Sequence, residues 1–313
     1  MKSAEGRFST ELNNRMEQIK DKAISVSGGL WTWLKDFELL VKLRLTLTVL
    51  FSAIMAWAIV TPVWAWRTFG LLLFGGFFVT AAANALNEAL EKDYDRLMTR
   101  TAARPMAAGR MSMSKGVLMA GLMSVIGFLL LGAINLLAVF FGALALVSYA
   151  FVYTPMKRVS TAAIPIGAIP GAMPMLIGAV AADGNLTPLG LTLFAIQFLW
   201  QFPHFWAIGW LGFEEYQKAG FKMVQARKGK PDAQLGLQAA FYALCLAVIS
   251  WVPYKLGSTG MVSAVLACLL SLGFAWAGWK LYRQKNRKAA LGLMFYSLLY
   301  LPLVLILLFV DKV

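Results

Sequence analysis

The sequence predicts an all-α integral membrane protein with nine transmembrane helices and its N-terminus in the cytoplasm. The chain is 59% hydrophobic and 14% charged, with a mean hydropathy of +0.67, whereas soluble domains are roughly 45–50% apolar. Apolar runs recur along it, each of about 20 residues, which is the length that crosses a bilayer core. The basic residues gather between alternate runs, and such a bias sets the orientation of a membrane protein.

Residues 1–36 form a polar extension of mixed charge ahead of the first apolar run. Ser9 or Thr10 can cap a short helix that ends near Ile24. The extension has no apolar core of the kind found in a cleavable signal, and its acidic residues are unlike a transit peptide. We therefore expect two parts: a cytoplasmic extension over residues 1–36, lying at the membrane surface, and a membrane domain over residues 37–313.

Each predicted helix corresponds to one apolar run that is long enough to span a bilayer. The nine runs are residues 40–61, 68–90, 115–134, 136–154, 161–182, 188–211, 235–255, 259–280 and 289–310.

The distribution of basic residues fixes the predicted orientation. With the N-terminus inside, all but three of the 29 Lys and Arg residues fall in inside segments, and only Arg67, Lys255 and Lys312 do not. The positive-inside rule then places the polar loops 91–114 and 212–234 in the cytoplasm and the C-terminus outside. This topology also explains the net charge of +14, so we predict no nucleic-acid partner, because the basic residues are spread over short loops.

The fifth run, residues 161–182, contains three prolines and three glycines between Pro165 and Gly178. One interpretation is a kinked helix that lines a cavity, with its freed carbonyls bonded by neighbours. The other is close packing of helices through small residues. The two interpretations are compatible, and the sequence favours neither.

The densest group of polar side chains lies at the end of the second run. If its helix continues, Asn87, Glu91 and Asp95 form a stripe down one face, because a step of four residues rotates by only about 40°. Their oxygens suit Mg²⁺, which keeps several waters and also binds substrate phosphate. The alternative is a solvated helix end held by salt bridges, but ionisable residues beside a bilayer core usually have a function.

Further polar clusters are predicted at the same membrane face. In residues 153–158 a proline stop precedes two cations, for which simple anchoring at the membrane surface is an alternative. A lone histidine lies among aromatic residues in the last third of the sixth run, and by itself it is better explained by an interfacial hydrogen bond than by a ligand role. The residues concerned are Arg100, Arg104, Tyr153, Lys157, Arg158, His204, Glu214, Glu215 and Lys218.

Acidic clusters with nearby cations at the mouth of an apolar cavity suit a metal-complexed diphosphate that carries an apolar tail. Mg²⁺ and cationic side chains neutralise a departing pyrophosphate, which makes ionisation of an allylic C–O bond feasible. Aromatic walls then shield the carbocation until a second substrate is alkylated. A transporter with a midplane site would also have broken helices, but it would place charges deep within the spans rather than at their ends.

At these motifs the sequence resembles the UbiA superfamily of intramembrane prenyltransferases, and within it the branch that acts on haem. The resemblance covers about residues 38–305. It rests on NEALEKDYDRLMTRTAARP at 87–105 with GRMS, YTPMKR at 153–158, IGAIPGAMP at 166–174, FPHFWAI at 202–208 and EEYQKAGFKM at 214–223.

The resemblance assigns roles to residues that match the family's motifs. Asn87, Glu91 and Asp95 match its Asn-x-x-x-Asp-x-x-x-Asp motif for metal and diphosphate, with Glu91 in place of an aspartate. It implies substrate binding at Lys42, Arg44, Arg100, Arg104, Tyr153, Lys157, Arg158, Glu214, Glu215 and Lys218. With a haem substrate admitted, His204 becomes a candidate to orient the haem, by ligating iron or bonding a propionate.

The fold implied by the resemblance is a nine-helix bundle around a central cavity in the bacterial inner membrane. The activity implied is transfer of a farnesyl group from farnesyl diphosphate to a vinyl group of haem B, with Mg²⁺ as cofactor. Membrane lipid surrounds the chain, and haem A synthase or terminal oxidase assembly factors are candidate partners. Prenylation of a quinone precursor or another tetrapyrrole is the alternative activity.

Overall fold

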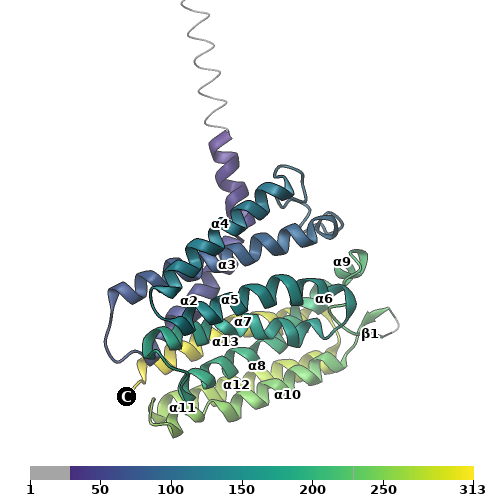
Figure 1. Cartoon of the computed structure of the whole chain (residues 1–313). Coiled ribbons are helices and arrows are strands. Elements are labelled where there is room, and N and C mark those ends of the chain that lie inside the picture. Colours follow the sequence, from purple (N-terminus) through teal and green to yellow (C-terminus); the bar gives the residue numbers. More distant parts are fainter. Residues whose placement is uncertain (1–28, 228) are drawn as a thin grey trace, which may run out of the picture.

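The computed structural model describes residues 29–227 and 229–313 as a bundle of long helices (Figure 1). The predicted N-terminal helix ending near Ile24 lies outside the described residues, and residues 29–40 are helical. The remaining elements are α2 Leu43–Val60, α3 Trp66–Asp95, α4 Met113–Gly132, α5 Leu136–Val147, a π-helix η1 Ser148–Tyr153, α6 Thr154–Val159, α7 Ala163–Asp183, α8 Pro188–Leu211, α9 Phe213–Lys218, β1 Ala226–Arg227, β2 Lys230–Pro231, α10 Gln234–Ile249, α11 Val252–Lys255, α12 Met261–Gln284 and α13 Arg287–Val310.

Eight helices in the described part of the chain are long and apolar enough to cross a membrane. They correspond to eight of the nine predicted runs, with ends that differ by a few residues. The ninth, α8, has 24 residues but is not among the eight, because Gln197, Gln201, His204 and its prolines dilute its apolar character. The multi-pass helical architecture is confirmed, and the count of nine spans stays a prediction.

The polar loops gather at one end of the bundle. Figure 1 shows α6, α9 and β1 at that end and α11 and the C-terminus at the other. In the segment between α3 and α4, Arg110 donates to both oxygens of Asp36, with Nε 2.9 Å from Oδ1 and 3.2 Å from Oδ2. This bidentate pair connects that segment to the helix over residues 29–40.

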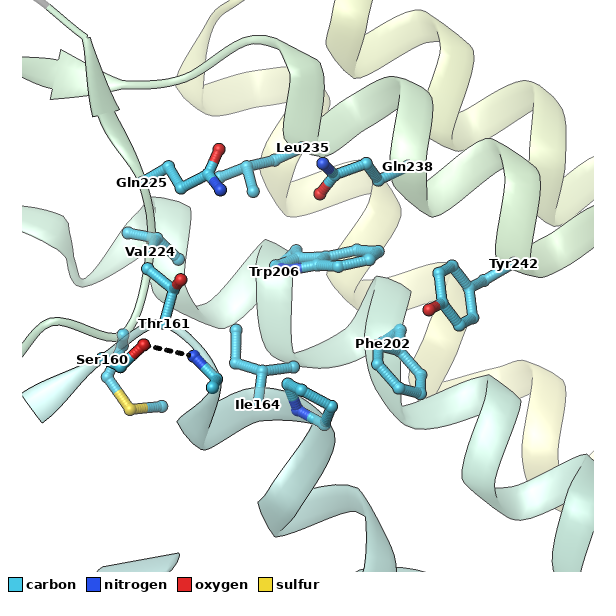
Figure 2. Close-up of a pocket in the computed structure, with 13 residues that line it drawn as sticks. Ser160, Thr161, Ile164, Phe202, Trp206, Val224, Gln225, Leu235, Gln238 and Tyr242 are labelled. Carbon is cyan, nitrogen blue, oxygen red and sulfur yellow. Dashed lines mark hydrogen bonds between the residues drawn. The ribbon is translucent and has the colours of Figure 1, made fainter. Parts of the chain in front are cut away.

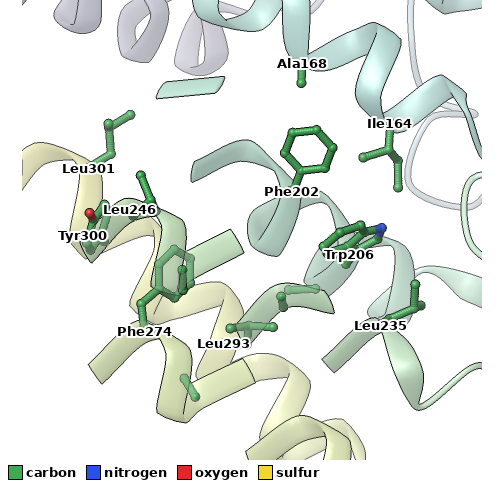
Figure 3. Close-up of a cluster of buried hydrophobic side chains, with 14 of the residues drawn as sticks. Ile164, Ala168, Phe202, Trp206, Leu235, Leu246, Phe274, Leu293, Tyr300 and Leu301 are labelled. Carbon is green, nitrogen blue, oxygen red and sulfur yellow. The ribbon is translucent and has the colours of Figure 1, made fainter. Parts of the chain in front are cut away.

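Helix α7 lies at the centre of the bundle. Its membrane-length window is 78% buried, against 28% for α4, and its residues belong to both large apolar clusters. One cluster joins α7 to α8, α10, α12 and α13 through side chains such as Phe202, Phe274 and Tyr300 (Figure 3). The other joins α7 to α2, α3, α4 and α5.

Both interpretations of the Pro- and Gly-rich run draw support from α7. The helix continues through Pro170 and Pro174, and two glutamines of α8 bond carbonyls in this stretch: Gln201 Nε2 donates to Ala168 O at 2.9 Å, and Gln197 Nε2 donates to Gly171 O at 2.7 Å. Amide side chains therefore satisfy backbone groups around the prolines. Close packing is also present, since a Cβ at Gly178 would collide with the backbone of α2.

The prediction that Pro155 ends the fourth span is wrong. The helix changes to a π-helix at Ser148–Tyr153 and then continues as α6 to Val159. Pro155 falls in the first turn of α6, where no backbone N–H is needed. The wide π turn sits where Thr154 and Lys157 face the polar end of α3, as π-bulges often do at functional sites.

Candidate active site

The predicted stripe lies on the last two turns of α3. The helix runs unbroken to Asp95, and Asn87, Glu91 and Asp95 are almost fully buried, with 1%, 3% and 0% of their surfaces exposed. Asp93 points away from the stripe with 82% of its side chain exposed. The three oxygen-bearing side chains therefore face the protein interior together.

Each stripe residue contacts a cation from a different part of the chain. Lys42, which precedes α2, donates to Asn87 Oδ1. Lys157 of α6 lies 2.8 Å from Glu91 Oε1, and Arg104, between α3 and α4, lies 2.7 Å from Asp95 Oδ2. The structure thus brings six predicted site residues together from four segments.

The site favours an anion. Three cations, Lys42, Arg104 and Lys157, contact the stripe with its two carboxylates. A fourth, Arg158, is held nearby on Tyr94, and Glu88 is one further buried carboxylate. Burial lowers the pKa of Lys42 well below its ordinary value, and the positive charge of Arg104 lowers it further. A bound anion would relieve this repulsion, because charge interactions are strong where water is largely excluded.

The oxygen atoms of the stripe fit a hard divalent cation. Asp95 Oδ1 is buried without a hydrogen-bond partner, while its other oxygen is held by Arg104. In the described part of the chain, no group of three or more His, Cys, Asp or Glu side chains is arranged to hold a metal. The protein thus offers a partial shell of carboxylate and amide oxygens, which suits a cation that completes its shell with water and substrate phosphate.

Aromatic side chains form a wall beside the cations. Arg158 Nη1 donates to the Tyr94 hydroxyl at 2.9 Å, and its guanidinium lies 4.6 Å from the centre of that ring. Tyr94 stacks on Phe221, and Lys157 Nζ lies 4.6 Å from the ring centre of buried Tyr153. These contacts hold the cations on aromatic faces, a geometry that is favourable away from water.

The second polar loop is joined to the first. Hydrogen bonds from Thr99 and from the backbone N–H of Arg100 lower the pKa of Glu215, and the N–H of Lys222 donates to Lys157 O at 2.6 Å. Helix α9 therefore lies beside the segment that carries Arg104. The remaining predicted residues Arg44, Arg100, Glu214 and Lys218 are exposed at this end of the bundle and are not brought onto the stripe.

His204 faces α13. Its Nδ1 lies 2.8 Å from Ser297 Oγ, and its ring stacks on Trp200 at 4.8 Å. The aromatic residues expected around it are divided: Phe205 contacts the imidazole, whereas Phe202 and Trp206 lie on another face of α8 and pack against Tyr242.

Phe202 and Trp206 instead line a pocket of about 420 Å³ between α7, α8, α10 and the segment before β1 (Figure 2). A neighbouring hollow of about 550 Å³ shares Thr161, Val224 and Gln225 with it and reaches Phe221. The pocket is therefore lined by none of the stripe residues or their cations.

Three residues at the site were not predicted from the sequence. Thr154 Oγ1 accepts a hydrogen bond from Asn87 Nδ2 at 2.9 Å. Tyr94 binds Arg158, and Glu88 is fully buried beside the stripe. A signal existed for Glu88, since a carboxylate directly after Asn87, where an apolar helix becomes polar, is costly to bury unless it is used. Thr154 depends on the π turn and has no local signal.

Comparison with known proteins places this chain in a family. The model of the UbiA prenyltransferase family matches residues 45–299. A protoheme IX farnesyltransferase of Cytophaga hutchinsonii is 40% identical over 276 residues, covering 88% of this chain and 96% of the relative. One from Flavobacterium johnsoniae is 40% identical over 285 residues, covering 88% and 94%.

Two solved structures share the fold. A digeranylgeranylglyceryl phosphate synthase superposes with a TM-score of 0.73 at 21% identity, covering 89% of this chain and 98% of that one. A UbiA homologue from Archaeoglobus fulgidus, bound to GPP and Mg²⁺, superposes with a TM-score of 0.58 at 15% identity, covering 87% and 99%.

Proposed function

The chain belongs to the UbiA prenyltransferase family, and from that premise we propose that it acts as a protohaem IX farnesyltransferase. It transfers the farnesyl group of farnesyl diphosphate to a vinyl group of haem B, gives haem O and releases diphosphate. The observation that carries this proposal is the buried stripe of Asn87, Glu91 and Asp95, met by cations from three other segments. Relatives that are 40% identical over nearly their whole length carry that activity in their names.

The stripe and its cations bind the diphosphate. Asn87, Glu91 and Asp95 would hold Mg²⁺, which when bound would supply positive charge to the departing pyrophosphate. Support for a divalent metal comes from the unpartnered Asp95 Oδ1 and from the Archaeoglobus fulgidus homologue that binds Mg²⁺ with GPP. Lys42, Lys157 and Arg104 turn toward the phosphate oxygens and compensate the charge that develops as the C–O bond breaks.

The apolar tail and the allylic cation are shielded by the bundle. Tyr149 and Tyr153 of η1 lie beside Lys157, and their ring faces can stabilise positive charge at C1 of the farnesyl group while they exclude water. The π electrons of the haem vinyl group then form the new C–C bond, and the cation left on the vinyl carbon next to the porphyrin ring is quenched by adding one solvent water and losing a proton. Ionisable side chains gather at one end of the bundle, which favours this enzyme over a transporter with a midplane site.

Haem B must lie so that a vinyl group reaches the allylic carbon. His204 is the residue we assign to orient it, by ligating iron or by bonding a propionate. The exposed residues Arg44, Arg100, Glu214 and Lys218, with Glu215, form the outer part of the diphosphate entrance. We further propose that these loops face the cytoplasm from a bacterial inner membrane, and that haem A synthase or terminal oxidase assembly factors receive the product.

Haem analysis in membranes tests the proposal. Membranes that contain the chain, supplied with haem B, farnesyl diphosphate and Mg²⁺, should yield a haem whose mass has increased by the added farnesyl-derived group. Membranes with the Asp95→Asn variant should yield only haem B, and the matched Asp93→Asn variant should behave as wild type. Haem B that stays unmodified beside a prenylated quinone precursor would replace this function with the alternative one.

A further inference from the structure

Glu88 is a buried carboxylate that the reaction outlined above does not use. It lies one residue after Asn87 on α3 and is fully buried. Its Oε1 accepts a hydrogen bond from the backbone N–H of Met106 at 2.8 Å, and its Oε2 is buried with no hydrogen-bond partner. Burying a carboxylate is costly. Its only described hydrogen bond is the one to Met106, so we ask what that bond contributes to the site.

The segment held by Glu88 carries one of the diphosphate cations. Lys42 directly precedes α2 and Lys157 lies within α6, but Arg104 belongs to the irregular segment between α3 and α4. Only one residue, Pro105, separates Arg104 from the N–H that Glu88 binds. Arg104 therefore relies on contacts of this segment, rather than on a helix, to place its guanidinium.

The segment is fixed to α3 on both sides of Arg104. Before it, Thr101 Oγ1 donates to the carbonyl of Asp95 at 2.9 Å. After it, Met106 donates to Glu88. Asp95 and Glu88 are seven residues apart and therefore lie on the same side of α3. The chain from Thr101 to Met106 runs back along the helix between these two attachments, and Arg104 reaches Asp95 Oδ2 from there.

We propose that Glu88 is a positioning residue for the diphosphate site, which acts through the Met106 N–H to hold Arg104 against the stripe. The Glu88 side-chain oxygen accepts the Met106 N–H directly at 2.8 Å, so the contact fixes the backbone of the segment and needs only an acceptor oxygen at this position. The inference rests on the proposed function, because it assigns Arg104 to the diphosphate of a prenyl substrate.

The matched variants are Glu88→Gln, which keeps an acceptor oxygen and the side-chain volume, and Glu88→Ala, which removes both. In Glu88→Ala we expect the KM for farnesyl diphosphate to rise about tenfold, while the KM for haem B stays as in wild type. Glu88→Gln should restore a KM within about twofold of wild type. KM values that rise for both substrates in Glu88→Ala would show a general loss of folding and would overturn the proposal. An equal rise of the farnesyl diphosphate KM in Glu88→Ala and Glu88→Gln would overturn it as well.

A double-mutant cycle tests whether Glu88 acts through Arg104. Binding of inorganic pyrophosphate with Mg²⁺, measured by calorimetry on the purified chain, should weaken about tenfold in Glu88→Ala and less than about twofold when the same change is made in an Arg104→Ala background. Losses that multiply would show that Glu88 acts independently of Arg104 and would overturn the proposal.

Hydrogen exchange separates this inference from the proposed function. Amide exchange in a peptide covering residues 101–112 should accelerate in Glu88→Ala and stay at the wild-type rate in Glu88→Gln and in Asp93→Ala. If wild type makes no haem O but this exchange pattern and the pyrophosphate cycle hold, the proposed function fails and the role of Glu88 stands. Unchanged exchange in Glu88→Ala would refute the role of Glu88 whatever the substrate.

Discussion

At the scale of single residues, the stripe is a set of buried pairs in which each carboxylate or amide of the stripe has its own cation. Breaking a buried pair is costly because the remaining charge is left without compensation. Substitutions that keep the side-chain volume and the hydrogen bonds are therefore the ones that separate an effect on turnover from an effect on folding. Asp95 is the sharpest case, since one oxygen holds Arg104 and the other is unpartnered.

Asp95→Asn should reduce turnover by about 100-fold or more, because the amide cannot supply the negative charge that a metal-bound diphosphate site needs. The protein should still fold, since the amide keeps the volume of the carboxylate. Turnover with farnesyl diphosphate and haem B, together with thermal unfolding in detergent, checks both statements. Asp93→Asn is the matched control, and an equal loss there would contradict the stripe.

His204→Ala should weaken haem binding and shift the Soret band of the bound haem, while pyrophosphate binding persists because the stripe lies on another helix. Absorption titration with haem B and calorimetry with pyrophosphate measure the two effects separately. Ser297→Ala, which removes the hydroxyl 2.8 Å from Nδ1, should give a smaller shift of the same kind. An unchanged spectrum and unchanged turnover in His204→Ala would leave the imidazole as a packing residue.

At the scale of elements, α7 organises the bundle through close approach. Gly178→Ala should lower the free energy of unfolding by about 1–3 kcal/mol, because the new Cβ would collide with the Ala53 carbonyl and with Ala56 on α2. Gly121→Ala on α4 is the matched control, since nothing lies within 4 Å of its added Cβ, and it should leave stability unchanged or slightly higher. Thermal unfolding of wild type and both variants in one detergent measures this difference. Gly178→Ala as stable as Gly121→Ala would argue against tight α2–α7 packing.

The sequence predicted the helices well because length and apolarity decide where a chain crosses a membrane. It predicted the α3 stripe because helical spacing is local, and it singled out Lys42, Arg104 and Lys157 through motifs. It failed at Pro155, because the effect of a proline depends on whether the preceding turn widens into a π-helix. The partner of each stripe residue, and the face of α8 on which His204 lies, depend on helix packing that no local pattern encodes.

At the scale of the whole molecule, the chain is a membrane bundle with its chemistry at one end. The segments after α3, at α6 and after α8 meet there through the contacts of Lys157 with Glu91 and of Glu215 with Thr99. The two apolar clusters that meet at α7 hold this end in place. These segments therefore share one side of the membrane, and the side on which one of them lies gives the side of the whole site.

A cysteine at Ala102, in a chain whose Cys245 and Cys268 are replaced by alanine, should react with an impermeant thiol reagent only from the cytoplasmic side. The reason is the concentration of Lys and Arg in the loops at this end. A cysteine at Val63, which is exposed between α2 and α3, should react only from the opposite side. Labelling of position 102 from outside would reverse the proposed topology.

The central claim is that this site joins a farnesyl group to haem. Purified protein in lipid nanodiscs, given deuterium-labelled farnesyl diphosphate, haem B and Mg²⁺, tests it by mass spectrometry of the haem together with assay of released diphosphate. The account predicts a haem that carries the full deuterium label, formed in equal amount with diphosphate and absent with Asp95→Asn. Diphosphate released while every haem stays unlabelled would contradict it.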